Sequence, residues 1–501
     1  MSHTSGAAGD APVMRVAARP GDGRAVATVA RETGDVRVVE TGPTGIEGIE
    51  PLALATAGGR TAFLPDPDES TVRGAVEELA AGEVPGGTWT VDHDPGRRTL
   101  PRPSAGPLSV GRRRVLGPCG WVEPTTSADH AFVSPDRDAG DCPVGLLGRG
   151  RGDAVADEPA SDAWEPVRHS EGDPVVVVNA HETDDRPRAD RTLLAGAPLT
   201  VLDGAAAAAA HVGATDLVVY LAERDDLLAE RVRDAADAAT AELPVEVQVV
   251  AGPDEYRAGA PTCALEAMEG ADRIEPRLQP PTPAEHGLYG RPTVVHTPRT
   301  VAQVRAALAG PEEFDPDATD PGTRLVTVTG DVAAPATVEL EPDGDLDAAS
   351  EAVDLDGNYK MACVGGPLGG FTRSLEVEVG ARPLAAAGLG TDGVVELLTD
   401  RRCVVAAAGR RASFASEENS GRCVPGREGT EQLTALLRDV YGGDYEPETI
   451  RELGRVMQAS ANCRIGAHAP RPAMTAMDVF GAEVRAHAEG RCPAGVCEVA
   501  R

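Results

Sequence analysis

The sequence predicts a multidomain protein of α/β and α+β architecture that ends in a bundle of helices. A chain of 501 residues is too long for one hydrophobic core and implies roughly three or four domains. In its centre, segments with strand and helix patterns alternate, which is typical of a largely parallel sheet. Near its end, apolar residues recur at helical spacing in three successive segments.

The charge of the chain limits the classes of partner that it can bind. Its net charge is −33 and its pI about 4.7, and Lys360 is its single lysine. Such an excess of Asp and Glu keeps a protein soluble through self-repulsion, as in halophiles, so we expect adaptation to a salty cytoplasm. An acidic surface offers no cationic face to phosphates, so we expect no binding of nucleic acid.

The sequence carries no signal for a membrane or for export. It has no run of about 20 apolar residues and no charged leader followed by an apolar one. Its nine cysteines are scattered and odd in number, which fits a reducing compartment better than a disulfide framework. We therefore expect a cytoplasmic protein without membrane insertion.

Residues 13–90 are predicted to form a small α/β domain. Strand patterns at Val36–Glu40 and Leu52–Thr56 come before a helix pattern at Thr71–Ala81. No cysteine occurs before Cys119, so this domain has no thiol to offer to a metal cluster.

Three segments are predicted to lie outside the domains. Residues 1–12 are expected to form a tail. Residues 91–143 are rich in Pro, Gly and Arg, which indicates a linker or a belt over the next domain. Residues 491–501 contain two cysteines, which together with a histidine just before them supply three of the four ligands of a zinc site; an unliganded tail is the alternative. The three candidate ligands are His487, Cys492 and Cys497.

Residues 144–318 are predicted to form the central α/β domain. The run G-R-G-R-G at residues 148–152 is a glycine-rich turn, whose backbone N–H groups can approach a phosphate closely. A surface loop explains this run nearly as well. A strand at Val175–Val178, a helix at Asp226–Ala241 and a strand at Val245–Val250 give the alternating pattern of a parallel sheet.

Two further domains complete the chain. Residues 319–400 begin with period-two alternation and a turn at Gly330-Asp331, which predicts a β-hairpin. Residues 401–490 are predicted to form a helical bundle. Its helix patterns lie at Glu428–Val440, Glu448–Ala459 and Pro472–Glu489.

Motifs in these domains carry a resemblance to a known family. G-R-C-V-P-G-R-E-G-T, at residues 421–430, is similar to a cluster-binding run C-G-x-C-x-P-C-R-E-G-T. N-A-H-E-T-D-D-R, at residues 179–186, resembles an N-A-D-E-G-E-P-G run, and E-P-R-L-Q-P-P-T-P, from residue 275, resembles E-P-R-x-K-P-P-x-P. All three occur in the NADH-binding flavoprotein subunit of respiratory complex I and in its hydrogenase and formate dehydrogenase relatives. The resemblance covers residues 36–500.

This resemblance implies a fold and an electron path. The domains would be a thioredoxin-like module, an FMN- and NADH-binding domain, a ubiquitin-like β-grasp (SLBB-like) domain and an iron–sulfur bundle. NADH would reduce FMN by hydride transfer, and a [4Fe-4S] cluster at Cys423 and Cys463 would carry the electrons onward. The partners would be a thioredoxin-like [2Fe-2S] subunit and a catalytic subunit of dehydrogenase or hydrogenase type. The residues on the flavin and NAD side would be Gly148, Arg149, Gly150, Asn179, Glu182 and Arg299.

The chain departs from the family where the family's ligands lie. Ser420 and Gly426 stand at cluster cysteines, and Ala260 and Pro261 stand at an acidic pair that contacts NADH and flavin. In the first domain, two further cluster cysteines are replaced by Pro43 and Ile46. Two functions therefore stay open: an electron-transfer subunit of NADH dehydrogenase type, and a non-catalytic scaffold or regulatory paralogue without FMN and [4Fe-4S] sites.

Several narrower alternatives also stay open. Cys423 and Cys463 are ligands of a normal cluster, packed free cysteines, or ligands of another metal or a smaller centre. Residues 13–90 are a thioredoxin-like module without its cluster or an unrelated α/β domain. A polysaccharide- or vitamin-binding module built on the β-grasp element is a third function, which rests on fold analogy alone.

Overall fold

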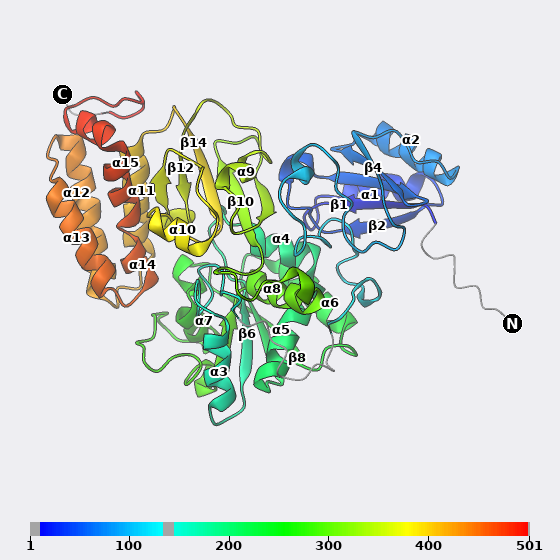
Figure 1. Ribbon diagram of the computed structural model, residues 1–501, viewed down its shortest axis with the longest axis horizontal. Coiled ribbons are helices and arrows are strands. Elements are labelled where there is room, and N and C mark those ends of the chain that lie inside the picture. The colour runs from blue at the N-terminus through cyan, green and yellow to red at the C-terminus, as the bar shows by residue number, and fades with distance from the viewer. Residues whose placement is uncertain (1–10, 134–144, 499–501) are drawn as a thin grey trace.

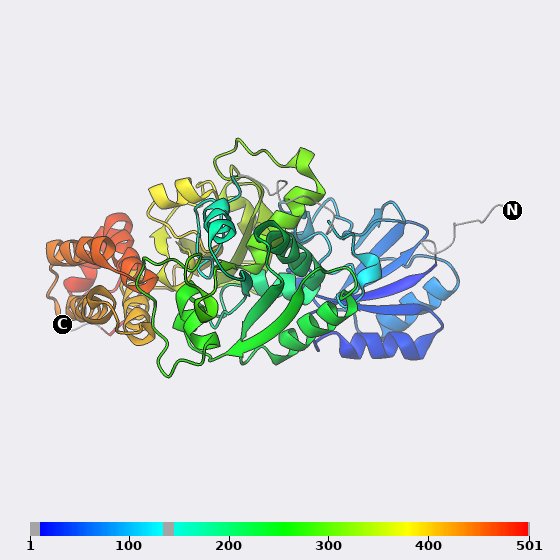
Figure 2. The ribbon, with the colours of Figure 1, turned by 90° about the horizontal axis from the view of Figure 1, so that it is seen from below.

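The computed structural model describes residues 11–133 and 145–498, which form three β-sheets and a C-terminal bundle of helices. Figure 1 shows the first sheet at one end of the molecule, the bundle at the other end, and two α/β parts stacked between them. Seen from below in Figure 2, the first sheet and the bundle again lie at opposite ends. The predicted mixed α/β multidomain class is confirmed. Most of the predicted tail and the junction 134–144 lie outside the described residues.

The first sheet has the strand order β2-β1-β3-β4-β5, with β1 and β2 parallel and the other neighbours antiparallel. Helices α1 and α2 cover one face, where Met14, Ala27 and Leu79 are buried. The other face packs against residues that follow this domain. The elements are β1 (Val13–Ala17), α1 (Arg24–Thr33), β2 (Arg37–Thr41), β3 (Leu52–Ala57), β4 (Arg60–Pro65), α2 (Glu69–Ala80) and β5 (Trp89–Asp92).

Residues 93–133 form a packed belt. They contain only short 3₁₀ turns, yet Leu100 and Leu116 are fully buried. The carboxylate of Glu339 accepts hydrogen bonds from the backbone N–H groups of Val115 and Leu116, each 3.0 Å long. The belt therefore joins the first sheet to the third.

The central sheet has the order β8-β7-β6-β9 and is parallel throughout, as predicted. Helices α5, α6 and α8 pack on one face and α7 on the other, so β6 is buried on both sides. The elements are α3 (Ser161–His169), β6 (Val175–Asn179), α4 (Ala189–Gly196), α5 (Pro198–Val212), β7 (Asp216–Ala222), α6 (Asp226–Ala238), β8 (Glu246–Gly252), α7 (Pro261–Met268), β9 (Thr293–His296) and α8 (Pro298–Ala309).

The third sheet has the order β11-β10-β14-β12-β13. Strands β10 and β11 form the predicted antiparallel hairpin, and β10 and β14 are parallel. Gly365 has φ +101°, and a Cβ there would lie 2.2 Å from the Cα of Gly390, so this glycine serves a close turn. The elements are β10 (Arg324–Gly330), β11 (Ala336–Leu340), α9 (Leu346–Ser350), β12 (Tyr359–Val364), β13 (Gly370–Thr372), α10 (Ala381–Ala386) and β14 (Val394–Thr399).

The bundle packs around Leu433, Phe480 and Val484, which are buried against β12 and β13 of the third sheet. A π-helical turn at Pro425–Gly429 leads into α12. Among the described residues no single helix is long and apolar enough to span a membrane; α4 and α5 reach that length only as a pair bent by 100°. The helices are α11 (Val404–Glu418), α12 (Thr430–Gly442), α13 (Pro447–Ser460), α14 (Arg464–His468) and α15 (Arg471–Ala488).

Candidate functional site

The predicted flavin-side residues meet at the carboxyl ends of the central strands, where open α/β sheets bind ligands. Asn179 ends β6, and its amide donates to the carbonyls of Gly152 and Gly259 at 2.9 and 3.0 Å. Gly150 lies against Arg299 of α8, because a Cβ on this glycine would be 3.3 Å from the guanidinium carbon. The structure thus brings together the glycine-rich turn, β6 and the start of α8.

The side chain of Arg151 occupies the middle of this site. Its Nε and Nη2 atoms each donate to the Glu182 carboxylate at 2.9 Å, and Nη1 donates to the Tyr256 carbonyl at 2.8 Å. The guanidinium carbon lies 3.8 Å from the centre of the Tyr256 ring. Burial alone would lower the pKa of Arg151, but the Glu182 carboxylate offsets this and raises it. Arg151 is therefore held as a cation with only 13% of its side chain exposed.

The space on the two sides of this pair differs. On the side of Asn179, Glu182 and Arg299 the cavity has a volume of about 20 Å³, whereas Arg151 and Tyr256 also line a second cavity of about 400 Å³. A cavity of the smaller size admits about one water molecule, whereas pockets for small molecules and cofactors have volumes of about 300–1,000 Å³. The cavity beside Asn179 is therefore too small for an FMN, and only the second cavity reaches the volume of a cofactor pocket.

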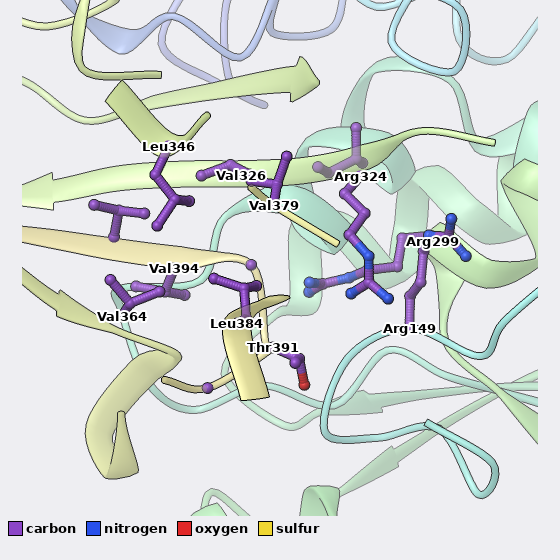
Figure 3. Close-up of a pocket in the computed structure, with 14 residues that line it drawn as sticks. Arg149, Arg299, Arg324, Val326, Leu346, Val364, Val379, Leu384, Thr391 and Val394 are labelled. Atoms are coloured by element: carbon purple, nitrogen blue, oxygen red, sulfur yellow. The ribbon is translucent and has the colours of Figure 1, made fainter. Parts of the chain in front are cut away.

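The other two predicted arginines are engaged in ion pairs. Arg299 contacts Asp190 through Nη2 at 2.6 Å and donates to the Asp392 carbonyl. Arg149 contacts Asp320 at 3.1 Å and donates to the Thr323 carbonyl at 3.0 Å. Figure 3 shows Arg149, Arg299 and Arg324 at one end of a narrow cavity whose other end is aliphatic; its volume is about 20 Å³. Neither predicted arginine has a free guanidinium to offer a phosphate.

The predicted cluster residues do come together. The sulfur atoms of Cys423 and Cys463 lie 3.3 Å apart, one before the π-helical turn and the other at the N-cap of α14. Burial raises the pKa of Cys463 to about 12 despite the Gly466 N–H beside its sulfur, so this side chain is a neutral thiol at pH 7. Gly426, at a family cysteine position, faces both sulfurs: a Cβ there would lie 3.1 and 3.2 Å from them.

This geometry does not fit a [4Fe-4S] cluster. Such a cluster takes four thiolates around a body of iron and sulfide. Two sulfurs in van der Waals contact leave no room for that body between them, and Gly426 brings no fourth ligand. The side chain of Ser420 lines a neighbouring cavity, as does Cys463.

That neighbouring cavity has a volume of about 400 Å³ and lies between α7 and the bundle. Ala260 and Pro261, which stand at the family's acidic pair, line it together with Cys463. Ser420, at a family cysteine position, lines it as well, so substituted positions about 160 residues apart in sequence face one space. Its wall carries Arg257, Arg277 and Arg464 together with Asp392, and Arg257 and Arg277 are each paired with glutamates.

The predicted zinc residues meet on the far side of the bundle. His487, Cys492 and Cys497 are joined there by Cys403, which precedes α11, and the four ligand atoms all lie within 4.8 Å of one another. His487 is fully buried, yet neither ring nitrogen has a hydrogen-bond partner. Three thiols and one imidazole are a donor set that zinc takes in tetrahedral structural sites.

Sequence reasoning missed Arg151 and Cys403. The sequence does contain a signal for Arg151, because a glycine-rich turn that carries a long cationic side chain must accommodate that side chain. Cys403 carries none, because it lies 84 residues before His487 and shares no motif with it.

Two family profiles match the chain. The "Nuo51 FMN-binding domain" matches residues 144–306. The "NADH-ubiquinone oxidoreductase-F iron-sulfur binding region" matches residues 406–487. The two matched segments contain the Arg151 site and the Cys423–Cys463 pair respectively.

Curated relatives match most of the chain. The F-type subunit of NADH-quinone oxidoreductase from Streptomyces coelicolor is 30% identical over 70% of this chain and 82% of its own length. An F-type subunit of the same enzyme from Rhizobium meliloti is 31% identical over 69% of this chain and 87% of its own length. The NADP-reducing hydrogenase subunit HndC of Solidesulfovibrio fructosivorans is 27% identical over 70% of this chain and 76% of its own length.

A solved structure has the same fold. A chain of an NAD⁺-reducing [NiFe]-hydrogenase in the H₂-reduced state aligns with a TM-score of 0.67 and 23% identity. The alignment covers 95% of this chain and 85% of the other, so the likeness extends to the first sheet and to the bundle.

Proposed function

Because this chain belongs to the family of the F-type subunits of NADH-quinone oxidoreductase, which includes hydrogenase subunits, we propose which part of that family's role it retains. It has the FMN-binding and iron–sulfur-binding domains of an electron-transfer family. We infer that it is a non-catalytic member, a scaffold or regulatory subunit of a redox complex that binds neither FMN nor a [4Fe-4S] cluster.

The buried Arg151–Glu182 pair carries this proposal. A flavin at this place would have to displace the guanidinium from a carboxylate, a carbonyl and the Tyr256 ring. Breaking a buried ion pair costs several kcal/mol, since it leaves an unpaired charge behind. The contact between the Cys423 and Cys463 sulfurs supports the same conclusion at the second redox site.

The first domain supports a scaffold role in another way. We propose that it is a thioredoxin-like module, because a β1–α1–β2 parallel unit is followed by the antiparallel pair β3–β4 and by α2. The loop that would hold its cluster is used for docking. The Gly45 carbonyl accepts the Thr337 N–H at 2.7 Å, and a Cβ on Gly42 would lie 2.2 Å from the Ala195 carbonyl oxygen.

The partners follow from the family. Relatives named as subunits of quinone oxidoreductases and hydrogenases act within larger assemblies, and we propose the same for this chain. A thioredoxin-like [2Fe-2S] subunit and a catalytic dehydrogenase or hydrogenase-type subunit are the proposed neighbours. The alternative, transfer of a hydride from NADH to FMN and of electrons to a cluster, makes the opposite prediction for cofactor content.

One experiment separates the two functions. The full chain is purified in high salt, reconstituted anaerobically with iron and sulfide, and incubated with FMN before gel filtration. We expect no broad iron–sulfur absorbance and no released flavin fluorescence above background. Four irons per chain, or one FMN per chain, would overturn the scaffold proposal and favour electron transfer. The S. coelicolor relative treated in parallel serves as the positive control.

We propose a separate structural role for the Cys403 group, as a zinc site that fastens the C-terminal segment to the bundle. An ion about 2.3 Å from each sulfur would complete a tetrahedral site. It would also supply the partner that the buried His487 ring lacks. The proposal adds Cys403, which precedes α11, to the predicted set of His487, Cys492 and Cys497.

Metal analysis tests this proposal. We expect one zinc per chain in protein purified without chelators, and loss of that zinc in Cys403→Ser. The matched control is Cys363→Ser, because Cys363 is also a buried free cysteine but is not one of the four residues of the group. Equal zinc content in the two variants, or none in the wild type after zinc is added, would contradict the site.

A further inference from the structure

The collapsed cluster site has a geometry of its own. Cys423 and Cys463 lie 40 residues apart in sequence, and their sulfur atoms are 3.3 Å apart. Each sulfur accepts a backbone N–H from the turn that follows it: Gly426 N–H for Cys423 and Gly466 N–H for Cys463, both at 3.3 Å. Two helical turns thus present their first N–H groups to a pair of thiols.

Two glycines allow this approach. A Cβ on Gly466 would lie 3.0 Å from the backbone nitrogen of Gly426, and a Cβ on Gly426 would touch both sulfurs. Any larger residue at either position would push the two turns apart. The glycines therefore keep the two sulfurs within reach of each other. In the family's ligand pattern, the corresponding sulfurs would instead surround a cluster.

We propose that Cys423 and Cys463 are a redox-active dithiol that closes to a disulfide, a modification site in place of the cluster. This inference rests on the proposed absence of a [4Fe-4S] centre. A disulfide needs a sulfur–sulfur distance of about 2.05 Å, so the sulfurs must move together by only about 1.3 Å. Rotation about the two Cα–Cβ bonds at the starts of the turns provides a shift of this size.

The oxidant enters through the cavity of about 400 Å³, whose wall includes Cys463. Cys423 lies behind it and is 7% exposed, so Cys463 is the sulfur that an incoming molecule meets first. A small disulfide RSSR is the chemical class that fits. The Cys463 thiol is neutral at pH 7, so it first loses its proton to solvent; its sulfur then attacks one sulfur of RSSR and releases RS⁻, which takes up a proton and leaves a mixed disulfide.

Cys423 then completes the exchange. Its thiolate attacks the Cys463 sulfur and expels the second RS⁻, so the two thiols lose two protons and two electrons and RSSR becomes two RSH. The product joins the start of α12 to the start of α14 across α13. One of its two ends, Cys463, lines the cavity together with Ala260, Pro261 and Arg464.

The test is a redox titration of the wild-type full chain in glutathione buffers. Free thiols are blocked with iodoacetamide, and the protein is digested and analysed by mass spectrometry. We expect a cross-linked peptide pair that contains Cys423 and Cys463 at the oxidising end, lost on reduction, with a rise of the melting temperature of several degrees on oxidation. The cross-link should vanish in Cys463→Ser and persist in Cys263→Ser, the matched control that lines the same cavity.

Iron analysis of the same samples keeps the two proposals apart. Four irons per chain would overturn the proposed function and the dithiol together. Iron-free protein in which both cysteines remain alkylated across the whole titration would overturn the dithiol alone. A cross-link of either cysteine to Cys263 instead would also contradict the proposed pairing.

Discussion

At the scale of single residues, the Arg151 side chain determines the shape of the predicted flavin-side site. Arg151 comes from a turn whose glycines suit a phosphate, yet its guanidinium contacts Glu182 and Tyr256 instead. A buried ion pair stabilises a fold little compared with apolar packing, but removing one partner is costly. Displacing Arg151 would therefore leave the Glu182 carboxylate without its cation.

Replacement of Arg151 by alanine should destabilise the protein. Arg151→Ala leaves the Glu182 carboxylate buried without its cation, and we expect a loss of about 3–5 kcal/mol in the free energy of unfolding. The double variant Arg151→Ala/Glu182→Gln should recover part of this loss, because the charge is removed as well. Chemical denaturation followed by fluorescence measures both.

The matched control for this prediction is an exposed ion pair of the same domain. Arg224 contacts Asp185 at 3.1 Å with both side chains open to solvent. Arg224→Ala should cost less than about 1 kcal/mol, since such pairs contribute little. A similar loss in Arg151→Ala and Arg224→Ala would mean that the Arg151 pair is not buried as described.

Glu50 should make stability depend on pH. Burial raises its pKa from 4.5 to about 7, against the hydrogen bonds that it accepts from Thr44. Its folded-state pKa is the higher one, so its effect on stability is most favourable below pH 4.5 and is lost as the pH rises to 7. Glu50→Gln should therefore be more stable than the wild type at pH 8, by on the order of 1–3 kcal/mol.

Calorimetry at several pH values tests this expectation. The melting temperatures of the wild type and Glu50→Gln should converge near pH 4.5 and separate above pH 7. A constant difference across this range would show that another property of the substitution is responsible.

At the scale of elements, the sequence predicts best those helices whose apolar residues recur at regular spacing. The three terminal helix patterns match α12, α13 and α15 to within two residues at each end. Strand β1 was missed because Arg15 interrupts its apolar run. The structure places that guanidinium over the ring of Trp121, 106 residues away, and a partner so distant leaves no local signal.

The same reason explains what was missed at the sites. The backbone positions of the flavin loop and the cluster loop could be predicted, because glycines and prolines mark them. The direction of Arg151 could not, since Glu182 and Tyr256 decide it from 31 and 105 residues away. The alternation of β10 predicted a strand, but burial of both its faces depends on the belt and on the helices packed there.

The alanine-rich helix α5 offers an element-scale prediction. A Cβ on Gly204 would lie 1.9 Å from the Val301 carbonyl oxygen of α8, so Gly204→Ala should force the two helices apart. We expect a loss of at least about 3 kcal/mol in the free energy of unfolding, in the range of severe overpacking. Thermal unfolding and soluble yield measure it.

Gly409 is the matched control, because it lies within α11 and a Cβ there would meet nothing within 4 Å. Gly409→Ala should stabilise the protein by about 0.5–1 kcal/mol, the helix propensity gained. Destabilisation by both substitutions would count against the close packing of α5 on α8.

At the scale of the whole molecule, charge should govern stability. The chain has 80 acidic and 47 basic residues, and repulsion among the unpaired carboxylates opposes folding. Salt shortens the Debye length from about 10 Å at 0.1 M to about 3 Å at 1 M and so weakens this repulsion. We therefore propose that the acidity is an adaptation to high salt.

The melting temperature should accordingly rise as KCl increases from 0.1 to 1 M. The variant Glu77→Lys/Glu78→Lys, on the exposed side of α2, should reduce the rise because it changes the net charge from −33 to about −29. Sucrose of matched osmolality should not reproduce this difference in melting temperature between the wild type and the variant. A melting temperature that is independent of KCl would contradict the proposal.

The buried carboxylate of Glu339 has a consequence for synthesis. It accepts the backbone N–H groups of the belt at residues 115 and 116, which leave the ribosome more than 220 residues before it does. At about 5–20 residues per second, this interval lasts roughly 10–45 s. During that time the parts of the first sheet and of the belt that pack against the third sheet lack their partner, so the nascent chain presents a binding surface for chaperones that the finished protein hides.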